Sequence, residues 1–456
     1  MMSRRSLSLP LVLALSVALV GCGDEDPAGP VSPVATITSP TSGASVSEGT
    51  TITLEGSAAD PQDGALGSAA LAWSSSIDGD LGTGTSVEIS APSLGVHTIT
   101  LTATDIDGNT GSTSIAVSVE ALAFLDGTVG DPQIGFVVNS TGNAISLFQL
   151  GNPTETRSVA LGASSAVTAG GISIRGERGA VPLGNAASVA MIDLRSLQIT
   201  GFYLFDGGNA TGSAFVDDET VVVANQSNDI VGKFSLSQSG TSITDTVRVA
   251  EFPNDVITVS DSLVLIVSSF LDDAFSPLGD GIVTAIDPRT MTVIDTVSTG
   301  GQNPQQGEIG PDGLLYVVNT GDYVNPSSMA IIDPATMTRL DVVDGFPSGS
   351  GDVHISSDGV LYTSAFFGGT AAWDTEAGDF IRDGSDPICA PLAGGGCRGA
   401  FAAHTDADGN LYQTFFGSAS QGLPPQVFRY AADTYALTDS IESAPGPVGL
   451  VIRAFR

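Results

Sequence analysis

The stretch Pro311-Asp312-Gly313-Leu314-Leu315-Tyr316-Val317-Val318-Asn319 decides the fold, because shorter copies of it recur further along the chain. The copies are Ser357-Asp358-Gly359-Val360-Leu361-Tyr362 and Ala407-Asp408-Gly409-Asn410-Leu411-Tyr412. Each copy joins an Asp-Gly turn to a short apolar run, which is the pattern of a tight turn followed by a buried strand. Each of the first two copies is followed by a second short apolar run that ends in an aspartate, Asp333 after the first copy and Asp374 after the second.

Weaker copies of the apolar run extend the repeat towards residue 133. When the runs are aligned on their last residues, these lie at positions 139, 183, 225, 268, 319, 365 and 415. The spacing matches one four-stranded blade of a β-propeller, which takes about 40–50 residues. Residues 133–456 are therefore predicted to form a seven-bladed β-propeller.

The repeat begins and ends part-way through a unit, which predicts how the ring closes. Residues 134–139 have the pattern of a second strand, and residues 447–452 have the pattern of the innermost strand that should precede it. Pairing of these two segments would complete one blade from both ends of the domain and remove the exposed edges of an open ring.

The strings Leu-Tyr-Val-Val-Asn at 315–319 and Ile-Asp-Pro-x-Thr-Met at 286–291 and 332–337 resemble the repeats of YVTN-type propellers. These proteins, also called YncE-like or surface-layer repeat proteins, have seven blades. The resemblance spans residues 133–456 and is strongest in the last four units. It implies the same all-β fold for this domain.

Residues 34–120 alternate apolar and polar residues with a period of two, as in His97–Ala103 and Ser114–Val119. Half-buried strands separated by turns at this spacing predict an antiparallel β-sandwich, with Trp73 in its core. The segments Leu71–Ser75 and Leu101–Gly108 resemble bacterial immunoglobulin-like and PKD-like domains, which implies a spacer or adhesive module.

The N-terminus predicts export and lipidation. Two arginines precede an apolar stretch that ends at Gly21-Cys22, which is typical of a secretory signal over residues 1–21. Leu19-Val20-Gly21-Cys22 resembles the bacterial lipobox, which implies that Cys22 is acylated; the alternative is an ordinary signal peptide that contains a cysteine. Residues 22–33 are expected to be an acidic, proline-rich tether and residues 121–132 a linker. We therefore expect a lipid-anchored protein of the cell envelope, on the outer membrane.

Composition limits the partners. The chain carries 50 acidic and 15 basic residues, a net charge of −35, and such a surface repels phosphate backbones, so nucleic acid is not an expected partner. Cys389 and Cys397 are expected to form a disulfide in an oxidising envelope, the alternative being two free thiols.

The Asp-x-Asp-Gly strings at 105–108 and 406–409 fit hairpin turns better than calcium loops, because neither continues to the glutamate of an EF-hand.

One set of residues could carry chemistry. Glu308, His354 and His404 each lie four residues before the aspartate of an Asp-Gly turn, so they occupy one position on the innermost strands of three consecutive blades. Two imidazoles and a carboxylate can bind zinc or another divalent metal. The alternative is that they point between blades and form hydrogen bonds.

Two functions follow. The first is a non-catalytic envelope protein without a cofactor, in which the sandwich is a stalk and the propeller a platform for a protein, glycan or peptide. The second is a metal-dependent lactonase-like or oxidoreductase propeller with Glu308, His354 and His404 at its centre. Phosphate-binding loops, zinc helices and nucleophile elbows are missing from the sequence, which favours the first.

Overall fold

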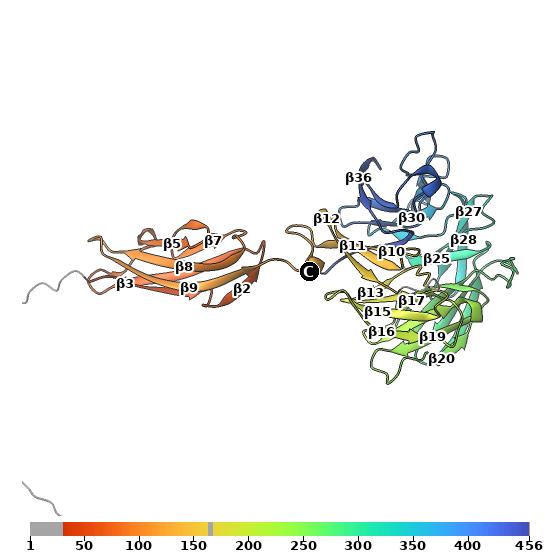
Figure 1. The fold of residues 1–456 in the computed structure, drawn as a ribbon, viewed down its shortest axis with the longest axis horizontal. Helices are drawn as coiled ribbons and strands as arrows, with labels where there is room; N and C mark the ends of the chain where they lie inside the picture. The colour runs from red at the N-terminus through yellow and green to blue at the C-terminus, as the bar shows by residue number, and fades with distance from the viewer. Residues whose placement is uncertain (1–30, 163–166, 456) are drawn as a thin grey trace, which may run out of the picture. The chain divides into compact units, whose positions relative to one another are not determined.

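The structure, a computed structural model, describes residues 31–162 and 167–455. The chain divides into two compact units, with the boundary between Ala121 and Leu122, and each is described by itself. Both consist of β-strands joined by turns (Figure 1). In the described ranges no helix has the length and apolar character needed to cross a membrane.

The first unit is a β-sandwich. In one sheet β3 (Ile52–Asp60) pairs with β1 (Val34–Ser39), β4 (Gly64–Ala65) and β7 (Ser86–Ile89). The other has the order β2 (Ala44–Ser47), β9 (Thr110–Glu120), β8 (Gly95–Thr104), β5 (Leu71–Ser75), β6 (Gly79–Thr83), and η1 (Ser68–Ala70) precedes β5. Every second residue of β3 is buried, as expected for a strand with one face on a core. Trp73 is 2% exposed in that core, and its Nε1 donates a hydrogen bond of 2.9 Å to the carbonyl of Gly84.

In its described residues the second unit forms seven four-stranded antiparallel sheets, so the predicted seven-bladed propeller is confirmed. From the innermost strand outwards the first four blades are β37 (Pro447–Ala454), β10 (Gln133–Asn139), β11 (Ala144–Gln149), β12 (Asn152–Ala160); β13 (Ser173–Arg175), β14 (Arg178–Pro182), β15 (Ser188–Asp193), β16 (Gln198–Leu204); β17 (Ala210–Phe215), β18 (Thr220–Asn225), β19 (Ile230–Ser235), β20 (Asp245–Arg248); and β21 (Pro253–Ser260), β22 (Leu263–Ser268), β23 (Ile282–Asp287), β24 (Thr292–Ser298).

The remaining three blades are β25 (Pro304–Ile309), β26 (Leu315–Asn319), β27 (Ser327–Asp333), β28 (Thr338–Phe346); β29 (His354–Ile355), β30 (Val360–Ala365), β31 (Gly369–Asp374), β32 (Asp379–Arg382); and β33 (Ala403–Thr405), β34 (Leu411–Phe415), β35 (Gln426–Tyr430), β36 (Leu437–Glu442). The described residues of this unit also contain three short 3₁₀ turns: η2 (Phe124–Asp126) precedes β10, η3 (Gln226–Asn228) lies between β18 and β19, and η4 (Ala419–Gln421) lies between β34 and β35.

Burial explains why the sequence repeats as it does. The second strand of a blade has neighbouring blades on both faces, so all five residues of β26 are buried and the strand is a continuous apolar run rather than an alternating one. The outermost strands face solvent, and β16 alternates exposed and half-buried residues. The repeat is therefore strongest where burial is complete.

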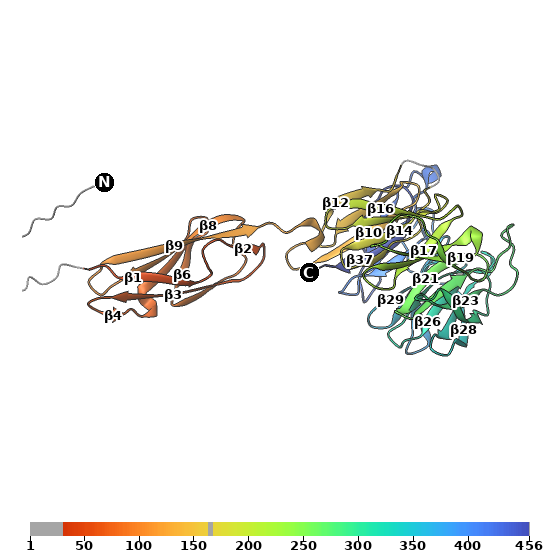
Figure 2. The same cartoon turned by 90° about the horizontal axis from the view of Figure 1, so that it is seen from below.

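The ring closes as predicted. β37 pairs antiparallel with β10, with Phe136 opposite Val451, so the C-terminal strand completes the blade that β10 began (Figure 2). Leu450 and Ile452 of β37 are 6% and 5% exposed, packed against the seventh blade. Across the same junction, the backbone N–H of Ala407 donates a hydrogen bond of 2.7 Å to Gln133 Oε1.

The segment expected to be a linker, 121–132, is part of the second unit from Leu122 onwards. Leu125 is 2% exposed and belongs to the core shared by the first two blades. The carbonyl of Phe124 accepts a hydrogen bond of 2.9 Å from Gln149 Nε2. The sequence pattern missed this because a single buried leucine on one 3₁₀ turn has no periodicity.

The Asp-Gly strings form turns. In both Asp-x-Asp-Gly strings the first aspartate accepts hydrogen bonds from the backbone N–H groups two and four residues later: Asp105 from Asp107 and Asn109, and Asp406 from Asp408 and Asn410, at 2.8–3.0 Å. Gly108 and Gly409 follow with φ of 89° and 79°, a conformation that glycine adopts without strain.

Candidate functional site

The innermost strand of each blade is the edge of its sheet. The backbone N–H and C=O groups on its free side therefore have no neighbouring strand of the same sheet to pair with. Three acidic side chains meet this need across consecutive blades. Asp255 accepts a hydrogen bond of 3.1 Å from the N–H of Gly307, Glu308 one of 3.1 Å from Ile355, and Asp352 one of 2.8 Å from Ala403. Each carboxyl therefore fastens its own blade to the next and stands at the wall of the central channel.

The channel holds a cavity of about 460 Å³. Residues from the inner strands of all seven blades contribute to its wall, and so do residues from the segments that lead into these strands, such as Gly171 and Asp352. Its polar lining includes Asn209, Gln226, Asn254, Asp255, Gln305, Glu308, Asp352, His354, His404 and Arg453. A hollow of this size accommodates a small polar molecule or the end of a larger one.

Carboxamide side chains form an arc on the wall of blades three to five. Asn209 Nδ2 donates to Gln226 Oε1 at 2.7 Å, and Gln226 Nε2 donates to Asn254 Oδ1 at 2.5 Å. Asn254 Nδ2 donates in turn to the carbonyl of Pro304 at 2.9 Å. An amide carries two donor and two acceptor positions, so these groups are fixed in orientation and still have capacity for a ligand.

The acidic wall is electrostatically costly. Burial raises the pKa of Asp352 to about 8, and the charges of Glu308 and Asp255 add to the increase. Burial also raises the pKa of Asp255 to about 6, again with a contribution from Glu308. Near neutral pH Asp352 therefore retains a proton that it would lose in water, whereas Asp255 is mostly ionised.

Glu308, His354 and His404 meet in this cavity, as their shared repeat position requires. The two imidazole rings stack with centroids 3.9 Å apart and planes inclined by 20°, and Glu308 Oε2 lies 3.6 Å from His354 Nδ1. Burial, followed by the neighbouring His354, lowers the pKa of His404 well below its usual value.

This arrangement does not form a metal-binding group. His354 Nε2 shares a hydrogen bond of 2.8 Å with Thr405 Oγ1, and His404 Nδ1 donates one of 2.9 Å to the carbonyl of Thr405. In stacked rings the remaining nitrogens lie in two nearly parallel planes and do not converge on one point. Across the described part of the chain, no three histidine, cysteine or acidic side chains are placed to hold a metal ion.

The order Glu308–His354–Thr405 is that of a carboxylate–imidazole–hydroxyl relay, but its geometry does not serve nucleophilic attack. Thr405 is 8% exposed and does not belong to the cavity wall. An activated hydroxyl must reach the substrate. The hydrogen bond between His354 and Thr405 instead joins the sixth blade to the seventh.

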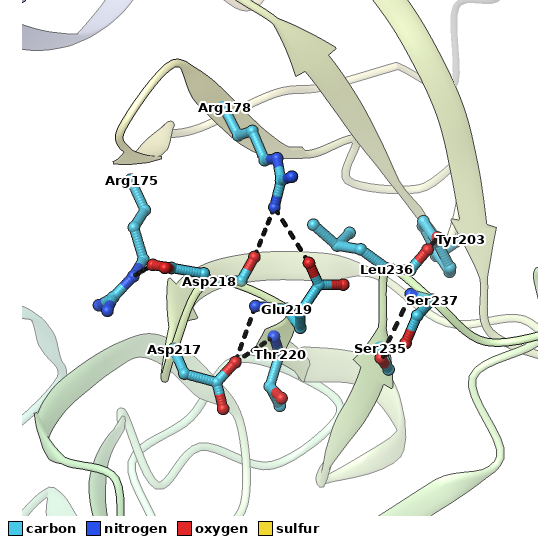
Figure 3. A network of polar contacts seen from close by, with 10 residues as sticks. All are labelled: Arg175, Arg178, Tyr203, Asp217, Asp218, Glu219, Thr220, Ser235, Leu236 and Ser237. Carbon is cyan, nitrogen blue, oxygen red and sulfur yellow. Dashed lines mark hydrogen bonds and ion pairs between the residues drawn. The ribbon is translucent and has the colours of Figure 1, made fainter.

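A second hollow of about 390 Å³ continues along the inner strands and is lined by Arg175 and Arg453. Arg175 is engaged elsewhere: its Nε lies 2.6 Å from Asp218 Oδ1, and Arg178 beside it donates to the carbonyl of Asp218 at 2.6 Å (Figure 3). Glu219 lies 3.5 Å from Arg178 in the same network. The charges of Arg175 and Arg178 are therefore neutralised by Asp218 and Glu219. Among the described residues, Arg453 is the arginine that lines the main cavity.

Of the charged and imidazole side chains of the main cavity, the sequence predicted Glu308, His354 and His404 but not Asp255 and Asp352. A signal existed for Asp352, which lies two residues before His354 and hence on the same face of an extended chain. Asp255 lies on β21, whose blade has no Asp-Gly turn to align. The amide arc has no common repeat position, so only the fold assembles it.

The predicted cysteine pair lies at bonding distance, with Sγ atoms of Cys389 and Cys397 1.97 Å apart. It closes a loop in the connection from β32 to β33. The predicted lipidation residue Cys22 lies outside the described residues.

Comparison with known proteins supports the fold alone. No protein-family model matches the sequence. No curated protein matches it either. Among solved structures, hydrazine synthase of Kuenenia stuttgartiensis is similar with a TM-score of 0.50 and 15% sequence identity, over 63% of this chain and 90% of that one. At this identity the similarity reports a shared architecture, and a fold found in 1127 matching chains does not select a function.

Proposed function

We propose that this chain is a non-catalytic binding protein whose ligand enters the central cavity of the propeller. The observation that carries the proposal is the cavity itself, a hollow of about 460 Å³ with amide, carboxyl and imidazole groups converging on it. Binding sites are typically concave and contain a few well-oriented polar groups. The amide arc and the three carboxyls are such groups.

The arrangement supports binding better than catalysis. Asp255, Glu308 and Asp352 each hold the backbone of the next blade, so they are fixed in place. His354 has hydrogen-bonding or charged partners at both ring nitrogens. Groups held in this way orient a ligand well but are poorly placed to act as acid–base catalysts on it or to coordinate a metal.

The sequence adds a location to the proposal. A lipid at Cys22 would hold the protein on the cell envelope, most simply at the outer membrane. Residues 22–33 would serve as a tether and the sandwich as a stalk that presents the propeller to an envelope protein, glycan, peptide or smaller ligand. One acyl chain binds a membrane only marginally, whereas two or more anchor it stably.

The test is to fill the cavity. A Cβ placed on Gly171, on the cavity wall, meets no atom of the described residues within 4 Å, and neither does one on Gly201 of the outer strand β16. Gly171→Phe should therefore occupy the cavity without disturbing the core, and Gly201→Phe is the matched control. Full-length protein is purified from its own envelope in detergent, and native mass spectrometry measures the mass of retained ligand. Loss of ligand in Gly171→Phe alone supports the proposal, and equal loading of both variants contradicts it.

A further inference from the structure

The cavity that we propose as the binding site has an unbalanced charge. Asp255, Glu308 and Asp352 line it, and the basic groups that face them are Arg453 and the imidazoles of His354 and His404. Burial disfavours protonation of His404, and Arg453 is a single cation. With its carboxyls ionised, the cavity is left with net negative charge.

The carboxyls also have unused acceptor atoms. Asp352 receives the Ala403 N–H on Oδ2, and Glu308 receives the Ile355 N–H on Oε2. Within the described residues, no hydrogen bond reaches Asp352 Oδ1 or Glu308 Oε1. Each oxygen of a carboxylate accepts up to two hydrogen bonds, so Asp352 Oδ1 and Glu308 Oε1 are acceptors that a ligand can use.

The spacing of these acceptors favours an organic cation over a metal ion. A metal ion needs several ligand atoms within about 2–2.6 Å of one point, and no three histidine, cysteine, aspartate or glutamate side chains in the described ranges are placed for this. An organic cation brings several N–H donors spread over a few ångströms. A guanidinium group has five donors in a planar fork and forms strong hydrogen bonds with carboxylates.

We infer that the cavity binds an organic cation, a guanidinium or primary ammonium group, whose N–H donors engage Asp352 and Glu308. The inference rests on the proposed function, because it names the ligand class of the same cavity. The independent observations are the hollow in the channel, its acidic wall with unused acceptors, and the adjoining amide arc, which supplies hydrogen bonds to the uncharged part of the ligand.

Binding should release protons. A cation favours ionised carboxylates, but burial holds a proton on Asp352 until pH values near 8. The ligand must therefore displace this proton, and its affinity should increase with pH by about tenfold for each pH unit in which one proton is released. Asp255, Glu308, His354, His404 and Arg453 are the other charged or titratable groups around it.

Agmatine, which carries a guanidinium and a primary ammonium group, is the probe. Isothermal titration calorimetry on detergent-solubilised full-length protein measures its affinity at pH 6 and pH 8. We expect binding at least tenfold tighter at pH 8, weakened tenfold or more by Asp352→Asn and by Glu308→Gln. Glu442→Gln on the exposed outer strand β36 is the matched control and should change neither value.

Four results overturn the inference: no binding of agmatine, equal binding of uncharged sorbitol, an affinity independent of both pH and Asp352→Asn, or saturable binding of calcium chloride that the same variants abolish. If one of these occurs while Gly171→Phe still loses its ligand, the ligand class is wrong and the proposed function stands. If Gly171→Phe also keeps its ligand, both fail.

Discussion

The side chain of Asp352 crosses from the sixth blade to the seventh, where its Oδ2 accepts a hydrogen bond of 2.8 Å from the backbone N–H of Ala403. The same carboxyl lines the cavity, and its other oxygen receives no hydrogen bond from the residues that the structure describes. It therefore has two roles, since it satisfies an edge strand and places negative charge where a ligand can meet it. A group with both roles makes the stability of the ring depend on pH.

Asp352→Asn should reduce this dependence. The pKa of Asp352 in the folded protein, about 8, lies above its value of 3.8 in the unfolded chain. The folded state therefore binds the proton more tightly, so the stabilisation is complete below pH 4 and is lost as the pH rises to 8. Asparagine keeps an acceptor for Ala403 and has no charge to bury. Between pH 5 and pH 8 the free energy of unfolding should fall by up to about 4 kcal/mol more in the wild type.

Urea denaturation at the two pH values measures this difference, and Asp439→Asn on the exposed strand β36 is the control. Parallel pH profiles for wild type and Asp352→Asn would show that the folded protein does not raise the pKa of this carboxyl.

Removal of β37 should open the ring. Truncation after Pro445 deletes Leu450 and Ile452 from the core and leaves β10 as an unpaired edge. The single change Ile452→Ala should already cost about 2–4 kcal/mol, as expected for a buried aliphatic side chain. Differential scanning calorimetry should show a lower melting temperature for Ile452→Ala and loss of the propeller transition, or aggregation, for the truncated chain. An unchanged transition after truncation would mean that another strand closes the ring.

Loss of the disulfide should have a moderate effect. The bond between Cys389 and Cys397 closes a short loop, and loop entropy gives it about 2.5 kcal/mol of stabilisation at most. The double change Cys389→Ser and Cys397→Ser should lower the free energy of unfolding by up to this amount under oxidising conditions and have no effect under reducing ones. Peptide mass spectrometry of non-reduced protein from the envelope checks the bond, and labelling of both thiols in that material would refute it.

The sequence predicted the fold well because the positions that repeat are the ones buried between blades. Residues such as Tyr316, Tyr362 and Tyr412 recur since each occupies the second strand of a blade between two neighbours. Closure was predictable for the same reason, because β37 carries the pattern of an inner strand that β10 lacks. Turns were predictable from the need for positive φ at Gly313 and its equivalents.

The site was only partly predictable. Glu308, His354 and His404 share one repeat position, and symmetry alone brings them to one cavity. Whether they bind a metal depends on ring orientation, and the stacking of His354 on His404 is set by contacts with Thr405 that no spacing encodes. The pKa of Asp352 is likewise a property of the assembled ring.

Membrane attachment has its own test. Cys22→Ser removes the thiol that the lipobox-like sequence assigns to acylation, so the variant should leave the membrane fraction and lose palmitate labelling. Cys389→Ser, which leaves Cys22 in place, is the control and should stay membrane-bound. Retention of Cys22→Ser in a detergent-extractable membrane fraction would contradict the lipidation.

The most direct measurement is a crystal structure of the protein with agmatine at pH 8. We predict electron density inside the central cavity, with guanidinium or ammonium nitrogens within hydrogen-bond distance of Asp352 and Glu308 and the remaining atoms beside the amide arc. Density confined to the outer surface, for example at the exposed rings of Phe366 and Phe367 between β30 and β31, with an empty cavity, would contradict the cavity as the binding site.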